Sequence, residues 1–187
     1  MVKRIIIFLR HGKTGKAEID LDRQLTEEGI QQAITRRAAM GQPMFDLVLA
    51  SSADRAKSTA AVIAGIDVHR VVGLDALYLP TDPADKNAVD EMFSQLAYSP
   101  LRAYREADIT GALMRYGANG TAAILELIED ADAKDILITG HAVLLNAVVS
   151  HMIDGDTDLI LDANLGEVEG LRVTISEDGS TSVELVQ

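Results

Sequence analysis

Four side chains in this sequence have the types and settings that phosphate chemistry needs. Arg10 and His11 are adjacent, and His141 directly follows a glycine. Arg55 ends the segment Ser-Ser-Ala-Asp-Arg. A neutral imidazole can attack phosphorus and hold the phosphoryl group covalently, while guanidinium groups bind its oxygens and offset charge in the in-line transition state. Brought together, these residues would form a phosphoryl-transfer site.

Three short apolar runs, rich in β-branched residues, precede these side chains. They span residues 4–9, 46–50 and 135–139, and they lack the strict polar alternation of a half-exposed strand. We therefore expect buried strands of a mainly parallel sheet. Ligands of such sheets bind beyond the carboxyl ends of the strands, so the polar residues after each run are predicted to converge on one rim.

The remaining pattern predicts an α/β domain of three layers, with a mainly parallel central sheet flanked by helices. Thr26 can cap a helix that runs to about Met40, because Glu27 and Glu28 follow in its first turn. The predicted domain is single and covers residues 1–187. Three further helices are predicted, one from about residue 53, one over 121–131 and one after Gly140. The segments 167–175 and 181–186 are predicted to form a C-terminal antiparallel hairpin, and residues around 80–118 a helical insertion.

The predicted chemistry assigns a role to each of the four side chains. His11 is the nucleophile, and Arg10 and Arg55 bind the phosphoryl oxygens. His141 donates a hydrogen bond to a phosphoryl oxygen, and water later releases phosphate. The helix that begins after Gly140 adds its N-terminal amides near Ala142. No metal and no cofactor is expected, because the protein itself supplies the positive charge.

The same residues carry a family resemblance. Residues 8–14, Phe-Leu-Arg-His-Gly-Lys-Thr, resemble the Arg-His-Gly signature of the histidine phosphatase superfamily, also called phosphoglycerate mutase-like. Residues 25–33, 51–60 and 138–141 are similar to the later segments of that family, in the same order. The resemblance implies phosphatase or mutase chemistry with His11 as nucleophile. The compact length is closest to short bacterial members, including phosphohistidine phosphatases of the SixA type.

The sequence departs from the family pattern at the proton donor for the leaving group. Many members carry a glutamate after the second arginine, where this chain has Asp75. Asp82, Asp85 and Glu106 are alternative candidates. The acid phosphatase branch has aspartate directly after its second histidine, but Ala142 stands there, which argues against that branch. A phosphohistidine substrate would need a strong acid less, because its P–N bond is labile once the ring is protonated.

Several further residues invite a functional interpretation. Thr14 and Ser52 are candidate phosphate ligands, although both residue types also serve as caps and turn residues. His69 and His151 do not follow predicted strands and are interpreted as structural or exposed. A nucleotide-binding P-loop is excluded, because its first glycine would fall on Ile7.

Composition limits the partners that we expect. The formal net charge of −12 disfavours nucleic acid and anionic membranes, and the absence of cysteine excludes disulfides and thiolate catalysis. The apolar runs are too short for a signal peptide or a spanning helix, so a cytoplasmic protein is expected. The oligomeric state stays open.

The function predicted is a metal-independent phosphatase that acts through a phosphohistidine intermediate on a phosphorylated small molecule or a phosphohistidine protein. Two alternatives remain open. The first is a phosphoglycerate mutase-type isomerase, which would use the same catalytic parts. The second is a non-catalytic module that binds phosphorylated protein.

Overall fold

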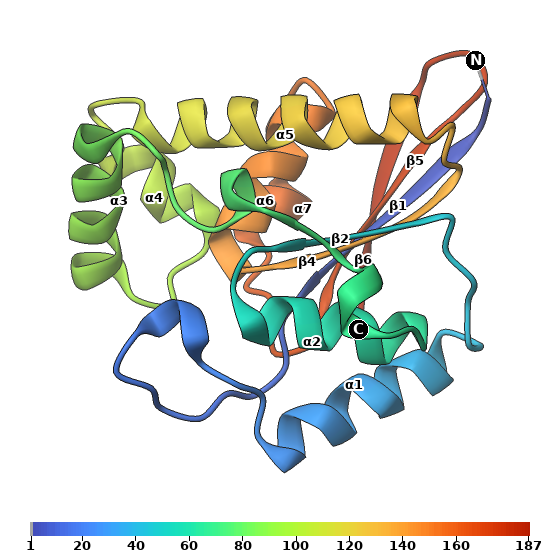
Figure 1. Ribbon diagram of the computed structural model, residues 1–187. Helices are drawn as coiled ribbons and strands as arrows, with labels where there is room; N and C mark the ends of the chain where they lie inside the picture. The colour runs from blue at the N-terminus through green and yellow to red at the C-terminus, as the bar shows by residue number, and fades with distance from the viewer. Residues whose placement is uncertain (1) are drawn as a thin grey trace.

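The computed structural model describes residues 2–187, which form six β-strands and seven α-helices in three layers (Figure 1). The order of the strands in the single sheet of these residues is β3-β2-β4-β1-β5-β6. The pairs β1–β4, β4–β2 and β2–β3 are parallel, and the pairs β1–β5 and β5–β6 are antiparallel. The α/β class, the mainly parallel sheet and the C-terminal hairpin are thereby confirmed. The strands are β1 (Arg4–Arg10), β2 (Leu47–Ser51), β3 (Val72–Leu74), β4 (Asp135–Gly140), β5 (Gly170–Ile175) and β6 (Thr181–Val186).

Alternation along β1 shows why the sheet has helices on both faces. Ile6 and Phe8 pack into one hydrophobic cluster, whereas Ile7 and Leu9 pack into another. All four side chains are almost fully buried. Because successive side chains of a strand point to opposite faces, each face of the sheet must be covered by helices.

Helices α1 (Glu27–Ala39) and α2 (Asp54–Ala64) cover the face of Ile7 and Leu9 (Figure 1). The Thr26 hydroxyl accepts a hydrogen bond from the amide of Gly29, so the predicted cap of α1 is confirmed.

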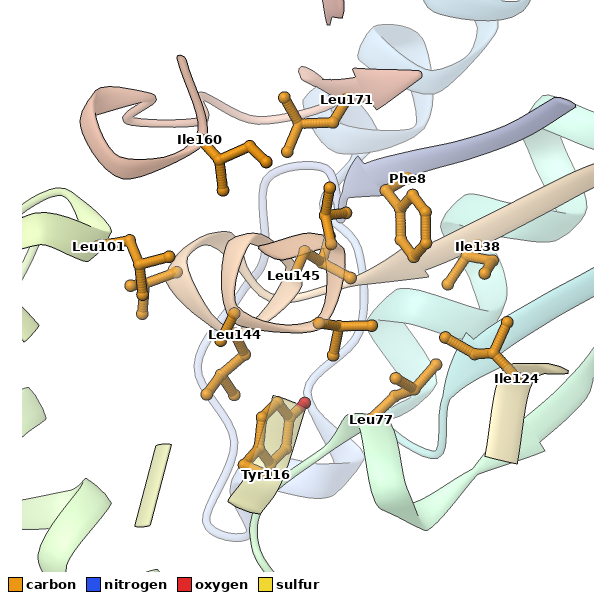
Figure 2. Packing of buried hydrophobic residues seen from close by; sticks show 14 of the residues in the cluster. Phe8, Leu77, Leu101, Tyr116, Ile124, Ile138, Leu144, Leu145, Ile160 and Leu171 are labelled. Atoms are coloured by element: carbon orange, nitrogen blue, oxygen red, sulfur yellow. The ribbon is translucent and has the colours of Figure 1, made fainter. Parts of the chain in front are cut away.

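The opposite face is covered by α5 (Ala112–Asp130) and α6 (Ala142–Met152). In Figure 2, Leu145 of α6 points toward Phe8 and Ile138 of the sheet, whereas Leu144 points toward Tyr116 of α5. The helix after Gly140 is buried as predicted, since Val143 through Ser150 are all buried.

The prediction of a helix over residues 121–131 was wrong at its start, because α5 begins nine residues earlier, at Ala112. Glycine has a low helix propensity, yet Gly117 and Gly120 both lie inside α5. A Cβ on Gly117 would stand 2.6 Å from the carbonyl oxygen of Ala147 in α6. Glycine therefore permits the close approach of α5 and α6, and tertiary packing outweighs helix propensity.

The segment 80–118 holds α3 (Pro83–Leu96), α4 (Leu101–Ala107) and the first residues of α5. In Figure 1, α3 stands at the same end of the molecule as the loop that joins β1 to α1. The short α7 (Asp158–Asp162) and β3 were not predicted, because a run of three to five residues carries too little periodicity. A helix that could cross a bilayer is not found in the described part of the chain.

Candidate active site

The three strand ends converge as the sequence predicts. Arg10 is the register partner of Gly140, and the amide of His11 donates to the Gly140 carbonyl at 3.0 Å. The rings of His11 and His141 are 5.3 Å apart between centroids, in an edge-to-face arrangement. Arg55, in the first turn of α2, joins them from the end of β2.

Hydrogen bonding fixes which nitrogen of His11 is free to react. Its Nδ1 lies 2.8 Å from the Gly12 carbonyl oxygen, which can only accept, so Nδ1 carries the proton. The lone pair is then on Nε2, which receives a long 3.3 Å hydrogen bond from Arg55 Nε. Gly12 is required here, because a Cβ would lie 2.7 Å from the carbonyl oxygen of Gly29. The Gly12 amide donates to Thr59 Oγ1 at 3.1 Å, which anchors the turn.

The surroundings keep His11 uncharged. Burial and, to a smaller extent, the charges of Arg55, Arg10 and Arg23 lower its pKa to about 4, against the opposing effect of the hydrogen bond to Gly12. At neutral pH the imidazole is therefore a neutral base with an available lone pair, the form that nucleophilic attack needs.

His141 is held by a residue that the sequence analysis did not select. Its Nε2 lies 2.8 Å from Ser51 Oγ, and Ser51 is fully buried at the end of β2. Burial, followed by the effects of His11 and Arg55, lowers the pKa of His141 well below its usual value. Both histidines of the site are thus neutral.

The two predicted arginines are anchored in different ways. Arg10 Nη1 donates to the Leu165 carbonyl at 2.8 Å, and its guanidinium lies 5.9 Å from the centre of the Tyr98 ring. Arg55 is only 4% exposed, so its charge needs close partners. Its two terminal nitrogens donate to Asp20, one to the backbone carbonyl and one to the carboxylate.

Asp20 lies on a 3-10 turn (Asp20–Asp22) in the loop after β1. Its carboxylate accepts from Arg55 Nη2 at 2.7 Å, from the Tyr78 hydroxyl at 2.9 Å and from Arg23 Nη1 at 3.0 Å. Desolvation alone would raise the pKa of Asp20, but the hydrogen bonds from Arg23, Arg55 and Tyr78 outweigh it and bring the pKa to about 2. Asp20 is therefore ionised.

Two cavities open beside His141. The smaller, about 170 Å³, is called the His11 cavity, and the larger, about 590 Å³, is called the Asp20 cavity. Phe93, His141 and Leu144 line both. The His11 cavity is otherwise lined by Arg10, His11, Ala97, Tyr98, Ser99, Ala142, Val143 and Asn164, and the Asp20 cavity by Ile19, Asp20, Leu21, Arg55, Tyr78, Leu79, Lys86 and Asp90.

The lesser phosphate-ligand candidates lie in varied settings. Ala142 begins α6 and lines the His11 cavity. Thr14 Oγ1 accepts a hydrogen bond from Arg23, and Ser52 is half-buried beside Gly73. Their roles toward phosphate remain predictions.

The candidate proton donors are spread over three elements. Asp75 is exposed in a 3-10 turn (Asp75–Leu77), and Asp82 caps α3 through the amides of residues 84 and 85. Asp85 pairs with Arg115, and Glu106 is exposed on α4. The choice among them remains open.

The structure adds four polar side chains to the site: Ser51, Asp20, Arg23 and Tyr78. Ser51 could have been selected, because it directly precedes Ser52 at the same strand end. The other three lie on loops whose course no periodicity predicts.

Within residues 2–187 no group of three or more histidine, aspartate or glutamate side chains is arranged to hold a metal ion. His69 and His151 are exposed.

The sequence matches the family model described as the histidine phosphatase superfamily (branch 1) over residues 6–187. No curated protein matches it significantly. Among solved structures, the fold is similar to that of the protein histidine phosphatase SixA complexed with tungstate (16% identity, 96% of this chain and 94% of that chain, TM-score 0.64).

Two further solved structures are similar in fold. One is a mycobacterial glucosyl-3-phosphoglycerate phosphatase (18% identity, 98% of this chain and 97% of that chain, TM-score 0.66). The other is phosphoserine phosphatase from Entamoeba histolytica in complex with 3-phosphoglyceric acid (21% identity, 100% of this chain and 98% of that chain, TM-score 0.69). At these identities the likeness is one of fold.

Proposed function

The chain belongs to the histidine phosphatase superfamily (branch 1), and from this premise we propose that it is a metal-independent phosphatase that works through a phosphohistidine at His11. The observation that carries the proposal is the neutral His11, with its proton on Nδ1 and its Nε2 lone pair beside Arg55. Nε2 attacks phosphorus, the N–P bond forms, and the bond to the leaving group breaks. Water then attacks phosphorus, the N–P bond breaks, and phosphate leaves.

Arginines supply the charge that this chemistry needs. Arg10 and Arg55 flank His11 and offset the negative charge that the phosphoryl oxygens carry in the transition state. If the Ser51 hydroxyl donates to Nε2 of His141, the Nδ1–H of His141 is left to donate to a phosphoryl oxygen.

For the substrate, we favour a phosphoryl group on a leaving group that departs readily, such as phosphohistidine. The two carboxylates that line the cavities support this choice. Asp20 is ionised and is therefore not set up to donate a proton, and Asp90 forms an ion pair with Lys86 at 3.4 Å. A phosphohistidine leaves as an imidazole and depends less on an enzymic acid.

Asp75 stays the first candidate for a proton donor. If it acts as one, Asp75→Asn lowers kcat for an alkyl phosphate by about a hundredfold and leaves p-nitrophenyl phosphate hydrolysis nearly unchanged, because nitrophenolate departs without protonation. A parallel Asp82→Ser variant keeps a helix cap for α3 and tests the next candidate. Equal kinetics of a variant and wild type on both substrates would remove that residue as the acid.

The two alternatives make different demands. A phosphoglycerate mutase-type isomerase must also bind the substrate carboxylate, and the lysine that lines the Asp20 cavity, Lys86, is already paired with Asp90. A binding module without turnover would not need a neutral nucleophile. Neither alternative is favoured by an observation of its own.

The test is hydrolysis of p-nitrophenyl phosphate with EDTA present, wild type against His11→Ala. His151→Ala is the matched control, because it removes an exposed histidine. We expect turnover in wild type and in the control, and its loss in His11→Ala. Alkaline denaturation followed by mass spectrometry should find phosphate on His11. Full turnover in His11→Ala would refute the mechanism, and phosphate binding without any adduct would favour the binding module.

A further inference from the structure

Asp20 is bound as a substrate anion would be bound. Its carboxylate accepts from two guanidinium groups and a phenol, those of Arg55, Arg23 and Tyr78, at 2.7 to 3.0 Å. Arginine forks and hydroxyl donors are the groups that bind phosphate oxygens. The Tyr78 ring also lies 6.0 Å from the Arg55 guanidinium and 5.7 Å from the His141 ring, so this anion position adjoins the proposed reaction centre.

Each of the three nitrogens of Arg55 already donates a hydrogen bond to a protein atom. Its Nη1 and Nη2 both donate to Asp20, and its Nε donates to the nucleophilic nitrogen of His11. Two of the five N–H donors of Arg55 are not used by these contacts, but both terminal nitrogens already donate to Asp20. The same arginine also partly covers the His11 lone pair. A bidentate contact of a phosphoryl group with the two terminal nitrogens, on the side that Asp20 occupies, therefore requires that Asp20 leave.

The turn that carries Asp20 is built to move at small cost. None of its residues, Asp20 through Asp22, is buried. The Asp20 side chain is 51% exposed, whereas that of Arg55 is 5% exposed. Displacing Asp20 thus returns a carboxylate to water without opening the hydrophobic core, while the guanidinium of Arg55 stays in place.

We propose that Asp20 is a displaceable internal anion that occupies the phosphate side of Arg55 in the substrate-free protein, and that the Tyr78 hydroxyl, once released by Asp20, becomes a further ligand of the phosphoryl group. This inference rests on the proposed function, because it deepens the same site. A phosphate dianion carries more charge and more acceptor oxygens than a carboxylate, so it replaces Asp20 on these donors. A singly charged ligand has no such advantage over the Asp20 carboxylate, so Asp20 discriminates against singly charged ligands.

The experiment is calorimetric titration of inorganic phosphate into wild type, Asp20→Ala and Asp22→Ala. Asp22 is the matched control, because it lies on the same turn, is exposed and carries the same charge. We expect Asp20→Ala to bind phosphate about tenfold more tightly than wild type, since no internal anion competes. Asp22→Ala should stay within about twofold of wild type.

The role of Tyr78 is tested in the Asp20→Ala background, where no carboxylate remains for its hydroxyl. There Tyr78→Phe should weaken phosphate binding about ten- to a hundredfold, the net value of one hydrogen bond to a charged group. An unchanged affinity would remove Tyr78 from the phosphate ligands and overturn that part of the proposal.

The outcomes separate this inference from the proposed function. If wild type binds phosphate but Asp20→Ala binds it no more tightly, Asp20 does not compete and the inference alone fails. If neither protein binds phosphate, the site is not a phosphate pocket and both proposals fail. Loss of affinity in Asp20→Ala would mean that Asp20 orients Arg55 for substrate, which also overturns the inference.

Discussion

Acidification should leave His11 uncharged well below the pH at which ordinary histidines become protonated. Its pKa of about 4, against a reference of 6.5, comes first from burial and then from Arg55, Arg10 and Arg23. At pH 5.5 an ordinary histidine is about 10% neutral, whereas His11 should be about 97% neutral. The proposed nucleophile should thus remain in its reactive form across the mildly acidic range.

The same shift makes stability depend on pH, and its sign follows from proton binding. Between pH 4 and 6.5 the unfolded chain binds a proton at residue 11 that the folded chain does not, so folding stability falls as the pH is lowered through this window. The difference between a pKa of 6.5 and one of about 4 corresponds to at most about 3 to 4 kcal/mol, since each pKa unit is worth about 1.4 kcal/mol. Most of this loss should be present at pH 4.5.

The measurement compares wild type with His11→Gln by urea unfolding at pH 7 and pH 4.5. We expect wild type to lose about 2–3 kcal/mol more than the variant, because other titrating groups act alike in both. NMR of the imidazole protons gives the midpoint directly, since the chain has four histidines and the variant identifies the signal of His11. A His11 midpoint near 6.5 with equal acid sensitivity of both proteins would refute the reasoning.

Two further variants test the supports of the site and of the fold. Ser51→Ala removes the 2.8 Å contact with His141 and should lower kcat/KM about tenfold, while Ser182→Ala, at an exposed serine on β6, should leave it unchanged; equal effects would contradict the assignment. Gly117→Ala places a methyl group 2.6 Å from a backbone oxygen of α6. The variant should lose roughly 1–3 kcal/mol of net unfolding free energy, even though alanine gains about 1 kcal/mol of helix propensity. Thermal or urea unfolding measures this loss. Gly155→Ala, which meets no atom within 4 Å, is the control, and equal stability of the two variants would show that α5 and α6 can move apart.

Strand prediction succeeded where burial on both faces left a clear pattern. The runs that became β1, β2 and β4 are apolar because helices cover the sheet on both sides. The start of α5 was missed because its glycines serve helix packing, a tertiary contact that local propensity cannot express. The strand β3 was missed for a different reason, because its three residues carry too little periodicity.

The sequence predicts which residues meet at the strand ends, but it does not predict the loop residues that contact them. His11, His141, Arg10 and Arg55 lie at or directly after strand ends, so the parallel topology alone brings them together. Asp20, by contrast, comes to Arg55 through a loop whose path depends on contacts with distant parts of the chain, and sequence spacing gives no measure of them.

This difference divides the site into a fixed half and an exchangeable half. The fixed half is held by strand ends and by hydrogen bonds such as those of Ser51 with His141 and Thr59 with Gly12, and a change there should misplace the proposed nucleophile. The exchangeable half is the turn of Asp20, which has no buried residue and so can change in sequence at little cost in stability. Changes on that turn should therefore alter which anion is accepted, whereas changes at the strand ends should abolish the chemistry.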